Sequence, residues 1–222
     1  MRRIADGVWK LGGVPPNAIN VYLVGDVLID GATRFAGRRI LRQLRGRAVV
    51  AHALTHAHPG HQGASAEVCR TLGIPLWCGA GDADAMEQGT IAASRPPVLI
   101  NRIVDRVWSG PRYPVARRLR AGDEVAGFAV LEVPGHSPGH VAYWRASDRV
   151  LILGDVLTNL DTATGIPGLE EPKAYLTADP TLNRASARRL SELEPELVCF
   201  GHGAPLRNPW KFQAFVRRLP AT

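Results

Sequence analysis

The sequence predicts an α+β fold in which one β-sheet packs against another. Three observations favour it: strand-like runs come in meander-like groups, helix-like segments lie before, between and after them, and no repeat or linker interrupts the chain. The 222 residues, 45% of them hydrophobic, are enough for one domain with a large core. A single domain spanning residues 1–222 is therefore expected.

The N-terminal half alternates short β-rich runs with helix-like segments. Strands are expected at 18–24, 26–30, 49–55 and 75–78, and helices at 36–45, 63–73 and 80–88. Gly25 and Asp26 separate the first two strands, which is a hairpin signal. Gly46 and Gly73 are placed to end the first two helices.

The C-terminal half is expected to begin with three strands in quick succession. Strands are expected at 128–133, 140–145, 149–154 and 196–200, and a terminal helix at about 209–218. Asp179 and Pro180 form an N-cap and first-turn pair that opens a helix reaching about Leu193. Residues 158–178, rich in Gly, Pro and Thr, predict a loop, and the proline-containing stretch 89–115 stays unassigned.

Charge and composition favour a protein with neither nucleic acid nor a membrane as partner. The net charge is +7, but the arginine pairs are spread along the chain, mostly on helix-like segments where they suit a solvated face. No run of about 18 apolar residues occurs, and the N-terminal MRRIADGVWK lacks the apolar stretch of a secretory signal. The three cysteines have no CxxC spacing and suit a reducing compartment. We therefore expect a cytoplasmic protein.

Six of the seven histidines lie in three short clusters, each directly after a strand-like run. The clusters are THAHPGH (55–61), PGHSPGH (134–140) and GHG (201–203). Asp155 follows the run 149–154 in the same way. Strand ends that feed loops on one edge are where a rigid scaffold presents ligands.

Imidazole nitrogens and carboxylates suit Zn²⁺, Fe²⁺ or Mn²⁺. His56 and His58, with one residue between them, can both turn toward one cation from a loop that leaves a strand. His61 then has room to face a neighbouring site. The glycines and prolines around each cluster let the backbone come close. We therefore expect a metal site with zinc foremost, and iron or manganese as alternatives.

These motifs resemble those of the metallo-β-lactamase superfamily, and of its glyoxalase II-like members in particular. The superfamily's pattern is H-x-H-x-D-H, then a lone His, an Asp and a final His, each closing a strand. The matching residues are, in order, His56, His58, His61, His136, Asp155 and His202. NVYL (20–23) and LIDG (28–31) are also typical. The resemblance implies a four-layer αββα sandwich with the metals along one edge of the two sheets.

The resemblance also implies a role for each ligand. A first metal would be held by His56, His58 and His136, and a second by His61 and His202, with Asp155 as the bridge. Asp155 and His61 are accordingly the residues expected to act in catalysis. The implied chemistry is hydrolysis, in which the metal acidifies a water and steadies the developing oxyanion.

One position departs from the superfamily's pattern. Gly60 stands where the first motif has its Asp, which normally binds the second metal and orients the attacking water. We therefore expect a weak or empty second site. A chemistry unlike the standard dinuclear one, or an inactive member, stays open.

Three further residues near the motifs receive structural roles. His140 is expected to support the ligands rather than bind metal, and His52 to be a packed core histidine. Asp30 is expected either to hydrogen-bond near the metal loop or to cap a turn.

The resulting functional hypothesis is a metal-dependent hydrolase of a small ester-like carbonyl substrate, such as a thioester or lactone. Two alternatives stay open: a mononuclear iron oxygenase acting on a persulfide, and a non-catalytic metal-binding protein. A small-molecule substrate is the expected partner, and the sequence leaves the oligomeric state open.

Overall fold

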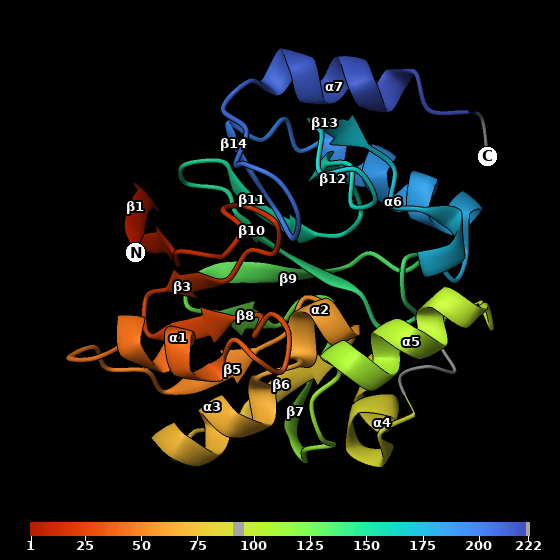
Figure 1. The fold of residues 1–222 in the computed structure, drawn as a ribbon. Coiled ribbons are helices and arrows are strands. Elements are labelled where there is room, and N and C mark those ends of the chain that lie inside the picture. The colour runs from red at the N-terminus through yellow and green to blue at the C-terminus, as the bar shows by residue number, and fades with distance from the viewer. Residues whose placement is uncertain (91–95, 221–222) are drawn as a thin grey trace.

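The computed structural model describes residues 1–90 and 96–220, and in it two β-sheets pack face to face between two layers of helices. Figure 1 shows α1 and α3 on the outer side of one sheet and α6 and α7 on the outer side of the other. This is the αββα sandwich that the resemblance implied. Within the described residues, no helix is both long and apolar enough to cross a bilayer.

The first sheet has seven strands in the order β1-β2-β3-β4-β5-β6-β7. The strands are β1 (Arg2–Ala5), β2 (Val8–Lys10), β3 (Tyr22–Val24), β4 (Val27–Ile29), β5 (Ala51–Ala53), β6 (Leu76–Gly79) and β7 (Val115–Leu119). The first four form an antiparallel meander, and β4 to β7 run parallel. The helices of this half are α1 (Gly37–Gln43), α2 (Pro59–Gln62), α3 (Ser65–Leu72), α4 (Ala80–Gln88) and α5 (Leu99–Trp108).

The second sheet has five strands in the order β14-β11-β10-β9-β8. The strands are β8 (Glu124–Val125), β9 (Phe128–Glu132), β10 (Val141–Arg145), β11 (Val150–Gly154) and β14 (Leu197–Phe200). Helix α6 (Pro180–Ser191) leads from β11 to its parallel neighbour β14, and α7 (Pro209–Arg217) follows. A separate hairpin, β12 (Thr158–Leu160) with β13 (Pro167–Glu170), precedes a 3₁₀ helix at Ala174–Leu176.

Three apolar clusters fill the spaces between the four layers. The central cluster joins the facing sides of the two sheets, with Tyr22 and Ile29 from one and Phe128 and Ile152 from the other. A second cluster packs α1 and α3 on the outer face of the first sheet. A third packs α6 and α7 on the outer face of the second sheet. Strands buried on both faces are continuous apolar runs in the sequence, which is why the sequence predicts β11 (VLILG).

Most predicted elements are present, often shortened at their ends. The hairpin at Gly25 is confirmed by the β3–β4 pairing, and Asp179 caps α6 by accepting from the Leu182 N–H at 2.9 Å. Gly73 ends α3 with a left-handed φ of 67°. The three cysteines are buried free thiols.

Two regions differ from the sequence prediction. The segment 158–178 is not a plain loop, because it contains the β12–β13 hairpin and the 3₁₀ helix. The unassigned stretch 89–115 contains α5 and the start of β7, and its residues 91–95 lie outside the described residues. Strands β1, β2, β7 and β8 were not predicted either, because three have at most four residues and the five-residue β7 (VARRL) carries an arginine pair.

Candidate metal centre

The ligand candidates lie together at one edge of the sandwich because of strand direction. β10 runs antiparallel to both β9 and β11, so β9, β11 and β14 end on the same side of their sheet. His136, Asp155 and His202 follow these three strands, and the first histidine motif follows β5 of the facing sheet. The carboxyl ends of strands thus form the site, as in many α/β proteins.

The carboxylate of Asp155 lies at the centre of the histidines. Four imidazole nitrogens surround its Oδ2 at increasing distance: Nε2 of His202 at 3.1 Å, of His61 at 3.3 Å, of His136 at 3.7 Å and of His56 at 4.0 Å. Asp155 is buried and His202 is half-buried. His58 adjoins this group, because its Nδ1 lies 3.0 Å from Nε2 of His136. The five predicted histidine ligands and Asp155 therefore form one cluster.

Among the residues that the structure describes, two groups of three donors are compact enough to hold a metal ion. One is His56, His58 and His136, and the other is His56, His61 and Asp155, with the donor atoms of each group within 4.8 Å of one another. Two donors bound tetrahedrally to one ion at about 2.0–2.1 Å are roughly 3.3 Å apart, which is close to the shorter distances seen here. The first group is the trio that the resemblance assigned to the first metal.

The second nitrogen of most of these rings is bound to protein. The Nδ1 atoms of His56, His61 and His136 lie 3.0 Å from Thr55 Oγ1, 2.9 Å from Asp30 Oδ2 and 3.2 Å from Thr177 Oγ1, respectively. Nδ1 of His202 bonds the carbonyl of Ala18. Such outer bonds fix the ring orientation and leave Nε2 pointing inward, as in protein metal sites.

The donor set fits a divalent cation. The buried Nε2 of His56 and Oδ1 of Asp155 make no hydrogen bond within the described residues, although buried polar atoms are normally paired. Gly201 keeps the space beside them open, since a Cβ there would lie 2.6 Å from Cε1 of His61. Imidazoles around one carboxylate suit Zn²⁺ as well as Fe²⁺ or Mn²⁺.

Burial and the two carboxylates give the histidines opposite protonation states. Burial, together with the neighbouring imidazoles, holds the pKa of His56 well below its usual range and lowers that of His136 to about 3. Burial also lowers the pKa of His61, but the carboxylates of Asp155 and Asp30 outweigh it and raise this pKa to about 10. Burial raises the pKa of Asp155, yet His202 and His61 hold it well below its usual range. Two members of the first trio, His56 and His136, are thus neutral near pH 7 and keep a lone pair available for a metal.

His140, His52 and Asp30, the residues predicted to have supporting roles, make the following contacts. Nε2 of His140 accepts from the backbone N–H of Asp155 at 3.1 Å, and its ring stacks on His56. His52 is fully buried away from the site, between the Leu28 carbonyl at 3.1 Å and Ser65 Oγ at 2.8 Å. Two roles were expected for Asp30, and the structure shows the contact with the metal loop, because Asp30 hydrogen-bonds His61.

Gly60 lies in the short helix α2, between His58 and His61. It does not have the positive φ that would exclude a side chain. A Cβ at this position would meet only Cδ1 of Ile19, at 3.7 Å, which is an ordinary contact. The backbone therefore accepts an Asp here, and the glycine is not required by strain or space.

Asp82 is the main supporting residue that the sequence reasoning missed. Its buried carboxylate accepts from the N–H of Ala57 at 3.0 Å, the N–H of Gly139 at 2.6 Å and the hydroxyl of Ser137 at 2.7 Å. It thus ties the first histidine motif to the second. A sequence feature that could have identified Asp82 is its position in the first turn of α4, directly after β6 at the same edge of the sheets.

Asn20 plays a similar part for the third cluster. Its amide donates to the carbonyls of Phe200 at 2.9 Å and Gly203 at 2.6 Å. These bonds hold the loop that carries His202 from both sides. The NVYL motif begins with this residue, so the motif has a structural role at the site.

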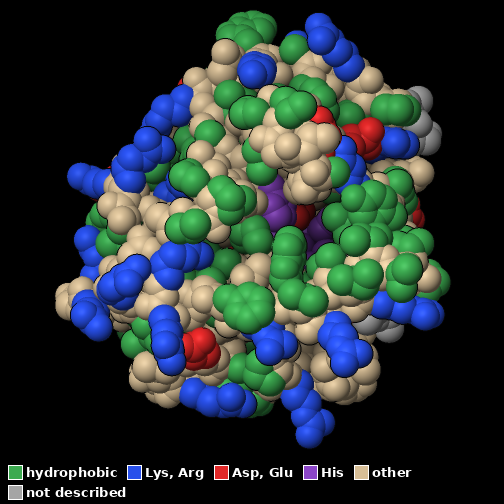
Figure 2. Space-filling view, viewed as in Figure 1, with side chains coloured by type: hydrophobic (Ala, Val, Ile, Leu, Met, Phe, Trp, Pro, Cys, Tyr) green, Lys and Arg blue, Asp and Glu red, His purple; other side chains and the backbone are tan. Residues whose placement is uncertain are grey.

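A cavity of about 400 Å³ opens over the metal centre, lined by His58, His61, His136, Asp155 and His202 together with apolar residues of α5 and of the 3₁₀ helix. Figure 2 shows histidine side chains at the floor of this hollow and apolar side chains around its rim. The volume is within the range of small-molecule sites. The centre is therefore accessible to a small ligand.

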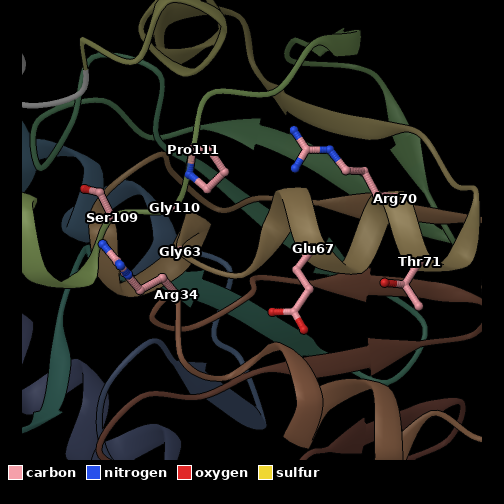
Figure 3. Close-up of a pocket in the computed structure, with 8 residues that line it drawn as sticks. All are labelled: Arg34, Gly63, Glu67, Arg70, Thr71, Ser109, Gly110 and Pro111. Atoms are coloured by element: carbon pink, nitrogen blue, oxygen red, sulfur yellow. The ribbon is translucent and has the colours of Figure 1, made fainter.

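A second, wider hollow of about 720 Å³ lies along α3. Arg34, Glu67, Arg70 and Pro111 are among its lining residues, and Figure 3 shows Glu67 and Arg70 pointing in opposite directions from the helix. No histidine lines it. We assign the functional site to the smaller cavity, where the titratable groups converge.

The fold and this site place the chain in a known class of metalloproteins. The sequence profile of the metallo-beta-lactamase superfamily matches residues 14–202, and the chain belongs to this superfamily. A probable metallo-hydrolase of Bacillus subtilis, YflN, is 26% identical over 224 residues, covering 87% of this chain and 84% of that protein.

Two further relatives are informative. The hydroxyacylglutathione hydrolase of Bdellovibrio bacteriovorus is 44% identical over 94 residues, but this covers only 40% of this chain and 34% of that protein. Among solved structures, TTHA1623 in a di-iron-bound form is 30% identical, with a TM-score of 0.62, covering 90% of this chain and 88% of that one. The chain is thus a member of a metallo-hydrolase superfamily, and its histidine cluster is a candidate metal site.

Proposed function

We propose that this protein is a metal-dependent hydrolase of a small ester-like carbonyl compound, such as a thioester or lactone. The observation that carries the proposal is the cluster of four imidazole nitrogens around Oδ2 of Asp155 at the floor of an open cavity. Partial matches to a hydroxyacylglutathione hydrolase and to an N-acyl homoserine lactonase of Bacillus thuringiensis support this substrate class.

The ligand roles form part of the proposal. His56, His58 and His136 would hold one ion, and His61, His202 and Asp155 would form the neighbouring site, with Asp155 shared. A bound Zn²⁺, or Fe²⁺ or Mn²⁺ in its place, acidifies water toward neutral pH and polarises a carbonyl oxygen. The di-iron form of TTHA1623 makes iron worth testing alongside zinc.

The residues of the chain prepare this chemistry. His56 and His136 are kept neutral by burial, so the Nε2 atom of each ring can offer a lone pair to a cation. Asp30 accepts the Nδ1 proton of His61, which leaves Nε2 facing Asp155. Asp155 supplies the negative charge of the centre, and Asp82 holds two of the histidine loops in place. With Gly60 in place of a carboxylate, the second site has one anionic ligand fewer.

Metal content and turnover test the proposal together. Protein purified without chelator should carry at least one Zn²⁺, Fe²⁺ or Mn²⁺ per chain and hydrolyse at least one member of a panel of esters, thioesters and lactones. His58→Ala should lower the metal content and abolish turnover, because the first trio loses a ligand. His52→Gln is the control, because it changes a buried histidine outside the site and should leave the metal content unchanged.

Three outcomes would count against the proposal. Unchanged metal content in His58→Ala would show that His58 is not a metal ligand. Oxygen consumption with a persulfide and Fe²⁺, without hydrolysis, would favour the oxygenase. Full metal loading without turnover on any substrate would favour a binding protein.

A further inference from the structure

Helix α5 leaves several large apolar side chains exposed. Ile100 is 48% exposed, Ile103 50% and Trp108 40%. Large apolar side chains gain stability from burial, so several exposed ones on one helix mark a candidate binding surface. Ile100, Val104 and Trp108 are spaced four apart, on one face of the helix, and all three line the cavity over the metal centre.

A second wall of the cavity is also apolar. Pro172, Tyr175 and Leu176 line it from the segment that includes the 3₁₀ helix. The two walls are joined by buried Asn101, whose amide donates to the carbonyls of Tyr175 at 2.5 Å and of Pro96 at 2.8 Å. We call the part of the cavity that these two apolar segments line the apolar channel. It is fixed by the fold, and it belongs to the same cavity as the histidines.

The one Lys or Arg side chain among the described residues lining this cavity is already paired. Nζ of Lys173 lies 2.8 Å from Oδ2 of Asp161 and 3.0 Å from Oε2 of Glu170. Two carboxylates around one ammonium leave no free positive charge for an anionic group. The walls beyond the metal centre therefore suit an uncharged, apolar part of a ligand.

We propose that the substrate carries an uncharged apolar arm, an alkyl chain of several carbons, and that the face formed by Ile100, Val104 and Trp108 binds it. This inference rests on the proposed function, and it narrows the substrate class. The occupant is a part of the substrate and not a protein surface, because this face continues into the cavity that contains the metal centre.

The expected selectivity follows from the area buried. Each methylene moved from water into the channel is worth up to about 0.8 kcal/mol, which is about fourfold in affinity. We expect linear carboxylates from butyrate to octanoate to bind the purified metal-containing protein with affinity rising about twofold to fourfold per added methylene. Linear carboxylates are the chosen probe because the acid group suits a metal centre while the chain reaches α5.

Two isoleucines of α5 provide a matched pair of variants. Ile100→Ser should flatten the chain-length dependence to less than about twofold per methylene. Ile103→Ser makes the same change on the same helix at a similarly exposed residue that does not line the cavity, and it should bind like the parent. Val104→Trp fills the channel and should abolish the gain for octanoate while sparing butyrate.

The outcomes separate the two proposals. Calorimetry that shows no chain-length dependence in the parent, or an equal loss in Ile100→Ser and Ile103→Ser, would overturn the apolar-arm inference. Hydrolysis of ester substrates regardless of chain length would overturn it as well, while leaving the proposed function intact. Chain-length-dependent binding without hydrolysis of any ester would support the arm site and count against the proposed function.

Discussion

Oδ2 of Asp155 lies 3.1 Å from Nε2 of His202, although the two residues follow different strands of the second sheet. The parallel pairing of β11 and β14 brings them together, since Gly154 pairs with Phe200 at the ends of these strands. A left-handed glycine precedes Asp155, and a Cβ at Gly154 would lie 2.7 Å from Cε1 of His140. The backbone at this edge thus places the carboxylate among the imidazoles.

Asp155→Asn should weaken divalent-cation binding by at least about tenfold and reduce hydrolysis to background, because it keeps the shape and removes the central charge. Equilibrium metal titration and turnover of the purified variant measure this. Asp179→Asn is the control, since Asn is an equally good helix cap and Asp179 lies outside the site. Parent-like metal affinity and turnover in Asp155→Asn would make this residue structural only.

Gly60→Asp should increase the number of metal ions bound per chain, with hydrolysis gained or raised. The position has neither a positive φ nor a close neighbour, so the new side chain is accommodated without strain. Its carboxylate adds a negative charge where Coulomb attraction is less screened than in water. Gly60→Asn, of the same shape but neutral, is the control and should show a smaller gain. Equal stoichiometry for parent and Gly60→Asp in a metal titration would contradict the idea.

Asp82→Asn should lower both the stability and the metal affinity. The carboxylate of Asp82 now accepts hydrogen bonds from two backbone N–H groups, and the amide nitrogen of Asn could not accept one. The lost hydrogen bond should lower the free energy of unfolding by about 1–3 kcal/mol. The loosened histidine loops should bind metal about tenfold to a hundredfold more weakly. Denaturant unfolding and metal titration measure the two effects. Asp84→Asn, on the same helix but exposed and paired with Arg118, should change neither by a comparable amount.

The stability of the metal-free protein should pass through a maximum near pH 6.5. Burial holds the pKa of His136 and of His140 at about 3 in the folded protein. Between about pH 6.5 and pH 3 these residues therefore take up protons when the protein unfolds. The free energy of unfolding accordingly decreases as the pH falls through this range. His61 behaves oppositely, because its two carboxylates raise its pKa to about 10 against the effect of burial. Its contribution is complete below about pH 6.5 and is lost as pH rises through 10.

Denaturant unfolding of chelator-treated protein across this pH range checks the prediction. Each such group changes the free energy of unfolding by at most about 1.4 kcal/mol per pH unit. His140→Gln should flatten the acidic side and leave the alkaline side as it was, while His61→Gln should do the reverse. A profile that stays level from pH 4 to 9 would contradict the assigned protonation states.

Much of the fold could be predicted from the sequence because its signals are local. Strands buried on both faces, such as β11, are continuous apolar runs, and helix ends such as Asp179 and Gly73 have their own chemistry. Helix α5 and the β12–β13 hairpin were missed for the opposite reason. Their apolar residues are half exposed and their strands short, so neither periodicity nor hydrophobicity marks them clearly.

The sequence by itself determined the candidate ligands, since each histidine cluster and Asp155 directly follow a predicted strand. Imidazoles and a carboxylate at several strand ends are side chains that can bind a metal. It could not reveal that Asp82 ties two of the clusters together, that Asn20 holds the loop of His202, or that the face of α5 lines the cavity. These relationships join residues far apart in the chain. They depend on strand order and on how the layers pack, which no local pattern encodes, so only the tertiary structure decided them.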